Sequence, residues 1–181
     1  MSRRWPATAK RSRTASATMV EMPTRYVNGL TIRTLRNGDT ETVAALLGRV
    51  GSGSRERRFC GAKPRFSEDE LTALARVDGE HHVLVGYLDG DPQPAGMARL
   101  VRDGASAEVA VEVADGYQGR GIGSTLGREL AADARAAGIT KLVATVCGDN
   151  QPVVSLLKRA GRSLQVRWRG REREFVVELG H

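Results

Sequence analysis

Three glycines at alternate positions, Gly119, Gly121 and Gly123, stand between a segment of strand character and an amphipathic helix. Glycine accepts positive φ and lets a ligand approach the backbone closely. The first amides of a helix have no acceptor within it and carry a partial positive charge. A glycine loop that opens a helix therefore suits an anion such as a pyrophosphate, and Arg120 can add a charge-assisted hydrogen bond. Such glycines alone are equally typical of a structural turn.

The elements that must hold this loop follow from apolar periodicity. We predict a strand before the loop, a helix after it, a second strand and a second helix, which are Ala107–Val113, Gly121–Ala137, Lys141–Cys147 and Gln151–Ala160. The first helix places Ile122, Leu126 and Leu130 on one face, and Gly138 stands at its C-terminal end. On the first strand, Glu108 and Glu112 share a face because side chains alternate along a strand.

The rest of the chain extends this pattern on both sides. Predicted strands are Leu30–Arg36, His82–Leu88, Ala95–Arg102, Leu164–Trp168 and Glu172–Leu179. A helix is expected from Asp39 or Thr40 to about Gly51, and a short one after the capping box formed by Ser67 and Glu70. Gly51–Lys63 is rich in Gly, Ser and Arg and is predicted to be a loop. The order indicates an α+β (mixed α/β) fold in one domain, residues 29–181, and not a doubly wound sheet.

The N-terminal residues 1–28 are predicted to be a disordered basic arm. Of the net charge of +7, +5 lies in residues 1–26, where Arg, Ser, Thr and Ala dominate. A transit peptide, or a true start at Met19 or Met22, are alternatives. Nucleic acid is not expected as a partner, since the arm offers only Trp5 and Tyr26 for stacking on bases. No apolar run reaches the roughly 18–20 residues of a membrane span.

The remaining reactive residues are interpreted as structural. Cys60 and Cys147 are expected to be isolated thiols, as in a reducing cytoplasm. His81 and His82 are adjacent and point to opposite faces of a strand, so we expect no metal site. A basic strip on the terminal hairpin is interpreted as a solvated edge, with steering of an acidic protein as the alternative; its members are Arg167, Arg169, Arg171 and Arg173.

The segment from Gln118 to Gly123 resembles the Q/R-x-x-G-x-G/A element of the GNAT acetyltransferase superfamily. The strand before it, the helix after it, and Asn150 at the start of the next helix match that family's order over about residues 30–179. Arg58-Phe59, Ser67–Leu71 and Ala107–Gly123 resemble more closely the acetyltransferase domain of bacterial Pat-like protein-lysine acetyltransferases. The resemblance implies a central, mostly antiparallel sheet of about seven strands, flanked by about four helices.

The same resemblance implies acetyl-CoA as cosubstrate. The backbone of Val111 and Val113 would contact the pantetheine arm, and Asn150 would hold the coenzyme or orient its reacting end. The pyrophosphate would lie on the loop residues Gln118, Gly119, Arg120, Gly121, Ile122, Gly123 and Ser124. No metal is expected.

The resemblance also implies the reaction. Acetyl transfer needs a neutral amine, and a lysine ammonium has a reference pKa of about 10.4, so a base must take a proton. Glu108 stands where Pat-like enzymes have their catalytic glutamate; Glu112 is the second choice. Many members have a Tyr acid where Leu157 stands here, and Ser155 and Tyr117 remain open as substitutes.

The implied function is an acetyl-CoA-dependent N-acetyltransferase in which the amine, that of a protein lysine, attacks directly in a ternary complex. Alternatives are a small-molecule amine acetyltransferase and a catalytically weak acetyl-CoA-binding regulatory module. A cytoplasmic location and a homodimer are further expectations.

Overall fold

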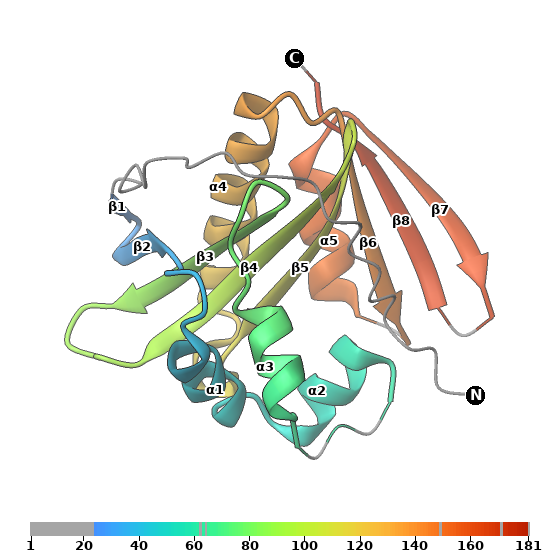
Figure 1. Ribbon diagram of the computed structural model, residues 1–181. Helices are drawn as coiled ribbons and strands as arrows, with labels where there is room; N and C mark the ends of the chain where they lie inside the picture. The colour runs from blue at the N-terminus through green and yellow to red at the C-terminus, as the bar shows by residue number, and fades with distance from the viewer. Residues whose placement is uncertain (1–23, 62, 64, 149, 171, 181) are drawn as a thin grey trace.

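An eight-stranded sheet runs through the computed structural model of the chain, which describes residues 24–61, 63, 65–148, 150–170 and 172–180 (Figure 1). The strands are β1 (Arg25–Val27), β2 (Leu30–Thr34), β3 (His81–Leu88), β4 (Pro94–Asp103), β5 (Ser106–Val113), β6 (Lys141–Cys147), β7 (Ser163–Arg169) and β8 (Glu172–Glu178). Their order in the sheet is β1-β2-β3-β4-β5-β6-β8-β7, and every neighbouring pair is antiparallel except β5 and β6. The expected mixed α/β, mostly antiparallel fold is confirmed.

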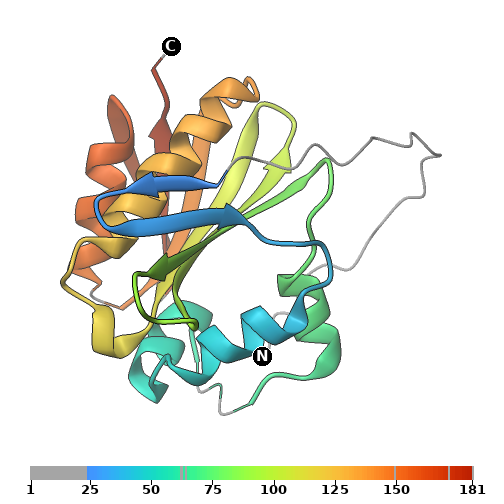
Figure 2. The same cartoon turned by 90° about the vertical axis from the view of Figure 1, so that its left-hand side faces the viewer.

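Helices cover both faces of the sheet (Figures 1 and 2). They are α1 (Thr40–Gly48), α2 (Ser52–Phe59), α3 (Glu68–Leu74), α4 (Ile122–Ala136) and α5 (Gln151–Ala160), with a 3₁₀ turn, η1, at Asp115–Tyr117. Leu126 and Leu130 of α4 and Leu157 of α5 belong to one buried cluster. Leu46 of α1 and Met97 of β4 belong to a second cluster, on the face that carries α1 and α3. Burial of these two apolar faces holds the layers together.

The middle of the sheet opens between β5 and β6. These two strands run parallel and pair at three positions, where Ser106, Ala107 and Glu108 face Lys141, Leu142 and Val143. Beyond these pairs β5 continues to Val113 and β6 to Cys147, while β6 stays paired with β8 along its whole length. We call the opening between the C-terminal parts of β5 and β6 the splay.

Two elements differ from the expectation of seven strands and four helices, since the described residues contain eight strands and five α-helices. Gly51–Lys63, predicted to be a loop, contains α2; its sequence has no apolar stripe, so periodicity could not reveal it. The arm predicted to reach residue 28 includes β1, which pairs with β2. Residues 1–23 lie outside the described residues.

Strand β1 is fixed by charge as well as by pairing, and it lies beside α4 (Figure 2). Arg25 forms ion pairs of 3.0 Å with Glu129 and 2.7 Å with Asp133 on that helix. His82 on β3 contacts the other oxygen of Asp133 at 2.8 Å.

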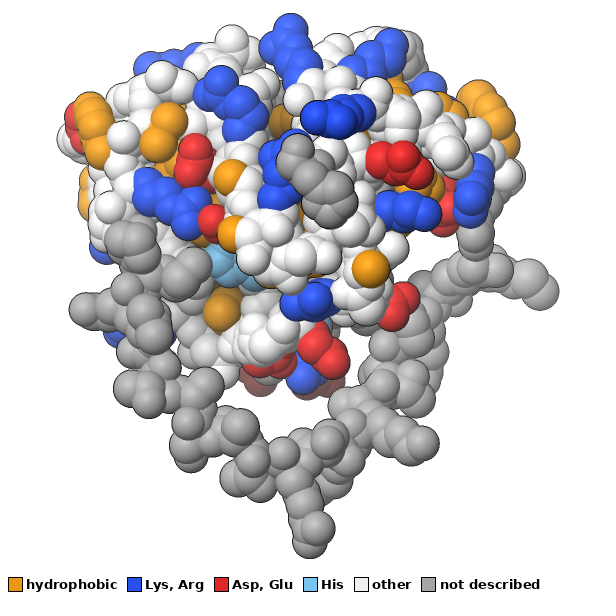
Figure 3. Space-filling view, turned by 90° about the horizontal axis from the view of Figure 1, so that it is seen from above, with side chains coloured by type: hydrophobic (Ala, Val, Ile, Leu, Met, Phe, Trp, Pro, Cys, Tyr) orange, Lys and Arg blue, Asp and Glu red, His pale blue; other side chains and the backbone are white. Residues whose placement is uncertain are grey.

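At the end of the molecule seen in Figure 3, basic and acidic side chains are intermixed. Among the described helices, none has the length and apolar character needed to cross a membrane.

The prediction that Cys60 and Cys147 are isolated thiols is wrong. The structure joins them in a disulfide, with their Cα atoms 5.4 Å apart although the two residues are 87 positions apart in sequence. Cys60 is the C-terminal cap of α2, in a left-handed conformation with φ of 57°, and Cys147 is the last residue of β6. The unpredicted helix α2 is what brings the first sulfur to the second.

Candidate active site

The open edge of β5 follows from the direction of its backbone groups. The amide of Ala114 donates to the carbonyl of Ala95, near the start of β4, at 2.9 Å. Backbone groups of successive residues in a strand point to opposite sides, so Val109, Val111 and Val113 direct theirs toward the splay. The Val113 carbonyl accepts from the Gln118 side chain at 3.3 Å. Val111 and Val113, both predicted to bind the coenzyme, thus face a gap that an extended ligand could enter as an added strand.

The glycine loop ends at a helix start without a side-chain cap. Three other helices have an N-cap residue whose side-chain oxygen accepts from the first turn, namely Asp39, Ser67 and Asn150. The N-cap residue of α4 is Gly121, which has no side chain and a φ of 81°. The amides of Ile122, Gly123 and Ser124 therefore keep their hydrogen-bonding capacity for a ligand. A partial positive charge adds to it, so the predicted loop has the character of a phosphate site.

Three arginines surround a groove of about 540 Å³ beside this loop. Arg120 comes from the loop, Arg128 from α4 and Arg159 from α5, with Ser124 and Leu156 also lining the groove. Sequence reasoning found Arg120 and missed the other two. No motif marks Arg128 or Arg159, because only the packing of α4 against α5 brings them together. Three cations around one groove suit a ligand with several phosphates.

Glu108 lies in the last pair of residues before β5 and β6 separate, opposite Val143 of β6 and Val101 of β4. Its neighbour Ala107 belongs to the core under α4 and α5. Alternation along the strand therefore turns the exposed side chain of Glu108 to the face that carries α1 and α3. There it can meet a molecule that approaches the splay from this face.

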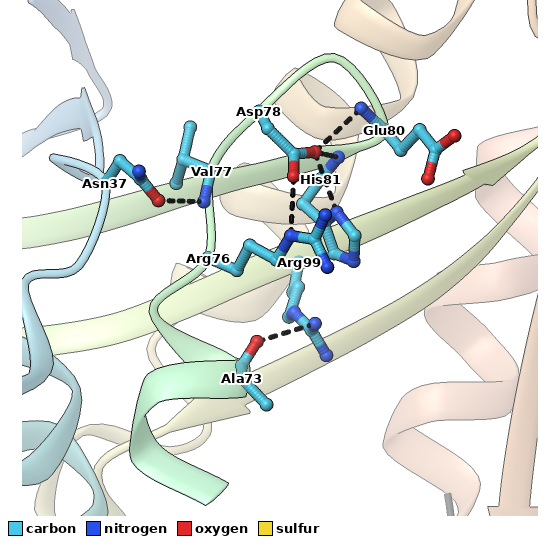
Figure 4. Close-up of polar contacts among 8 residues, drawn as sticks. All are labelled: Asn37, Ala73, Arg76, Val77, Asp78, Glu80, His81 and Arg99. Carbon is cyan, nitrogen blue, oxygen red and sulfur yellow. Dashed lines mark hydrogen bonds and ion pairs between the residues drawn. The ribbon is translucent and has the colours of Figure 1, made fainter. Parts of the chain in front are cut away.

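Glu112 shares the face of Glu108 and is only 5% exposed. Between the two along β5 lies Ala110, opposite Arg99 of β4. Arg99 is 6% exposed, and its guanidinium donates to the carbonyl of Ala73 in the last turn of α3 at 2.9 Å (Figure 4). The sequence did not single out Arg99. Burial makes Glu112 the less accessible of the two predicted bases.

The segment after α3 is held by Asp78, which receives four hydrogen bonds in Figure 4. Its carboxylate accepts from the amides of Glu80 and His81 at 2.9 Å each, from the ring of His81 at 2.8 Å and from Arg76 at 2.5 Å. Burial raises the pKa of Asp78, but the bonds from His81, Glu80 and Arg76 lower it more, so the pKa lies well below its usual range. His81 is thus a strand residue with a structural partner.

Gln118 connects the glycine loop to α2. Its side-chain amide donates to Ser54 at 3.2 Å, to the Val113 carbonyl at 3.3 Å and to Asp115 at 3.0 Å. These contacts orient the loop between the end of β5 and the start of α2. The predicted coenzyme residue Gln118 therefore positions its neighbours in this structure, and its side chain has three protein partners.

The candidate acids and Asn150 also have defined places. Asn150 caps α5 by accepting from the Val153 amide at 3.5 Å. Leu157, which stands where many GNAT members have a Tyr acid, is buried in the core. The Tyr117 hydroxyl donates to Asp91 at 2.7 Å, and this bond, with others from Gln93 and Arg49, lowers the Asp91 pKa to about 2. Ser155 is exposed on α5.

Comparisons with known proteins agree with this geometry. Residues 53–161 match the Acetyltransferase (GNAT) family. The chain is 31% identical over 157 residues to Acetyltransferase Pat of Mycolicibacterium smegmatis, a match that covers 84% of this chain and 47% of Pat. It is 28% identical over 130 residues to Acetyltransferase PA5475 of Pseudomonas aeruginosa, which covers 69% of this chain and 70% of that protein. The chain thus spans about half the length of Pat.

A solved structure shows the same arrangement. The GNAT domain of S. lividans PAT superposes with a TM-score of 0.74 at 25% identity, over 83% of this chain and 90% of that one.

Proposed function

We propose that this chain, which belongs to the GNAT acetyltransferase family, is an N-acetyltransferase whose acceptor is a protein lysine. Glu108 deprotonates the lysine for direct attack in a ternary complex. The observation that carries this proposal is the place of Glu108. It is an exposed carboxylate in the last pair before the splay, and Val111 and Val113 follow it on the open edge. The base and the coenzyme edge thus belong to one strand.

The residues of the chain fit acetyl-CoA. The uncapped start of α4 and Arg120, Arg128 and Arg159 suit its phosphates, and the open edge of β5 suits the pantetheine amides. When bound, the coenzyme supplies the acetyl thioester. Holding the phosphates and the amide arm together would fix the position of the thioester at the splay.

Glu108 then accepts a proton from the incoming ammonium, directly or through one water. The neutral nitrogen forms the amide bond, and the thiol leaves. With Leu157 buried where other members have an acid, no side chain is assigned to protonate the thiolate. A thiol with a pKa of about 8.5 is a good enough leaving group without one.

A protein lysine fits the exposure of the base. Glu108 lies open on a sheet face, where a side chain of another folded protein can reach it. The sequence resemblance to Pat-like protein-lysine acetyltransferases supports the same choice. A small-molecule amine and a catalytically weak acetyl-CoA-binding module are the alternatives, and a homodimer and a cytoplasmic location remain proposals.

Thiol release tests this function. The protein is mixed with acetyl-CoA and, in separate reactions, with lysine-containing proteins, polyamines and amino acids, and free thiol is measured. Release that requires a folded protein acceptor, with acetyl-lysine found by mass spectrometry, is the expected result. Faster release with a small amine favours the first alternative. Tight acetyl-CoA binding without release above the uncatalysed rate favours the regulatory module.

A further inference from the structure

Helix α2 lies between the ends of the two strands that form the splay. Just before it in the chain, the carbonyl of Arg49, the C-cap of α1, accepts from the amide of Asp115, just after β5, at 3.0 Å. Ser54 accepts from Gln118 at 3.2 Å. A Cβ on Gly51 would lie 2.3 Å from a carboxylate oxygen of Asp115, so the chain just before α2 lies close against the residue that follows η1's N-cap at the end of β5. The first end of α2 is therefore attached to the end of β5.

The second end of α2 is attached to β6. Cys60 caps the helix and is bonded to Cys147, the last residue of β6, and α2 lies against this strand near its end (Figure 1). Phe59 adds an edge-on contact with Phe66, their ring centres 5.1 Å apart. The helix thus bridges the open ends of β5 and β6 on the face to which Glu108 points.

Packing alone would hold α2 weakly. It has eight residues, an N-cap without a side-chain hydrogen bond, and no buried residue among those whose burial the structure describes. A helix this short is marginal in isolation, and most helices are stabilised by burying an apolar face. The position of α2 therefore depends on the attachments at its two ends, of which one is covalent and chemically reversible.

We propose that the Cys60–Cys147 disulfide is a redox tie that fixes α2 across the splay, and that its reduction weakens acceptor binding while coenzyme binding changes little. The regulated reaction is the proposed acetyl transfer, so the inference rests on that function. The acceptor approaches on the face of α2, whereas the arginine groove is lined by α4 and α5. The side-chain contact of α2 with the coenzyme loop, from Gln118 to Ser54, lies near the start of the helix, away from the end that the disulfide holds. Freed at one end, α2 must be ordered again each time an acceptor binds.

The reductant is a small thiol or dithiol. Its thiolate attacks one sulfur of the bond, a mixed disulfide forms, and a second thiol resolves it. The protein gains two electrons and two protons as two thiols, and the reductant leaves as its own disulfide. Cys60 is exposed, which gives the reductant access.

The test compares the full chain after air oxidation, the same chain after dithiothreitol, and the Cys60→Ser/Cys147→Ser double variant. Alkylation and mass spectrometry report the thiols, and hydrogen exchange reports the amides of residues 52–60. Acetyl-CoA affinity is measured by calorimetry, and acceptor KM by thiol release. Reduction should speed hydrogen exchange in α2. It should also raise the acceptor KM about tenfold, which corresponds to the entropy lost when about one residue is ordered again on acceptor binding. Acetyl-CoA affinity should change less than about twofold, well below that ordering cost. The double variant should show the same exchange rates and acceptor KM as the reduced chain, and dithiothreitol should not change them.

Two results would overturn the proposal. One is alkylation of both cysteines in the oxidised chain; the other is α2 exchange that dithiothreitol leaves unchanged. A Glu172 carboxylate oxygen and the two sulfurs lie within 4.8 Å of one another, so zinc alone is also added to the reduced chain. Tight zinc binding that blocks alkylation would replace the redox tie with a metal site. The exchange and alkylation readouts need no acceptor, so they separate failure of the tie from failure of the proposed acetyl transfer.

Discussion

Glu108 of β5 and Val143 of β6 form the last pair that joins the two parallel strands before they separate. On one side of this pair the backbone is held by the sheet, and on the other side the edge of β5 is open. The carboxylate is thus anchored on rigid structure beside the gap that we assign to the coenzyme. A base held on a strand keeps its geometry better than one on a loop.

Replacing Glu108 by Gln tests the base. The amide keeps the shape of the side chain but does not take a proton, so we expect kcat/KM to fall about 100-fold or more. Acetyl-CoA affinity, measured by calorimetry, should not change. The matched control is Glu178→Gln, an exposed carboxylate on β8, two strands away from β5, which should retain activity. Full activity of Glu108→Gln would remove Glu108 from the base role.

The two strand glutamates should differ in their effect on stability. Glu112 is buried, so Glu112→Ala should lower the free energy of unfolding by about 2 kcal/mol or more, because buried neighbours lose a polar partner. Glu108→Ala, at an exposed position, should change it by less than about 0.5 kcal/mol. Urea unfolding of both variants measures the difference. Equal and small changes would contradict the burial of Glu112.

Arg120→Ala tests the phosphate site. Loss of one charge-assisted contact should weaken acetyl-CoA binding about tenfold. Binding of S-acetylpantetheine, which has no pyrophosphate, should be unaffected. Calorimetry with both ligands gives the comparison, and Arg36→Ala, on an exposed residue outside the groove, is the control. Equal losses with both ligands would place Arg120 elsewhere in the mechanism.

The ion pairs of Asp133 predict a pH dependence. Burial raises the pKa of Asp133, but hydrogen bonds from His82 and Arg25 lower it more, and the net shift is downward. A lowered pKa contributes stability above the ordinary value of 3.8, and this contribution disappears as pH falls through the folded-state pKa.

Asp133→Asn should therefore destabilise the protein at neutral pH by about 1–2 kcal/mol. The deficit should shrink below about pH 4. Urea unfolding at several pH values measures it, with the exposed Asp103→Asn as control. A deficit that stays constant down to pH 2 would contradict the assignment.

Leu157→Tyr asks whether the missing acid can be restored. Leu157 is 2% exposed in the core, so the larger side chain should cost about 1–3 kcal/mol of stability by overpacking. We expect no gain in thiol release, because the substitution adds a hydroxyl to a packed interior. Thermal unfolding measures the loss of stability, and initial rates of thiol release measure activity. A faster reaction would show that the hydroxyl reaches the thiolate and would overturn this account.

The sequence by itself determined the local parts of this protein. Periodicity predicted β3 to β6, α4 and α5, because each buries apolar residues in the core, and Gly170 between two strand-like segments predicted the terminal hairpin. The capping box of Ser67 and Glu70 is present as predicted. The glycine spacing identified the loop, because positive φ at Gly119 and Gly121 is a local property of the backbone.

Only the tertiary structure decided the features that depend on distant segments. Helix α2 has no apolar stripe, so its contacts at both ends, and not its own pattern, place it against β6. Arg128 and Arg159 meet Arg120 only when α4 packs on α5. The bond between Cys60 and Cys147 joins positions 87 apart, a distance over which spacing carries no information about proximity. Long-range contacts of this kind follow from how two faces pack, which no single segment encodes.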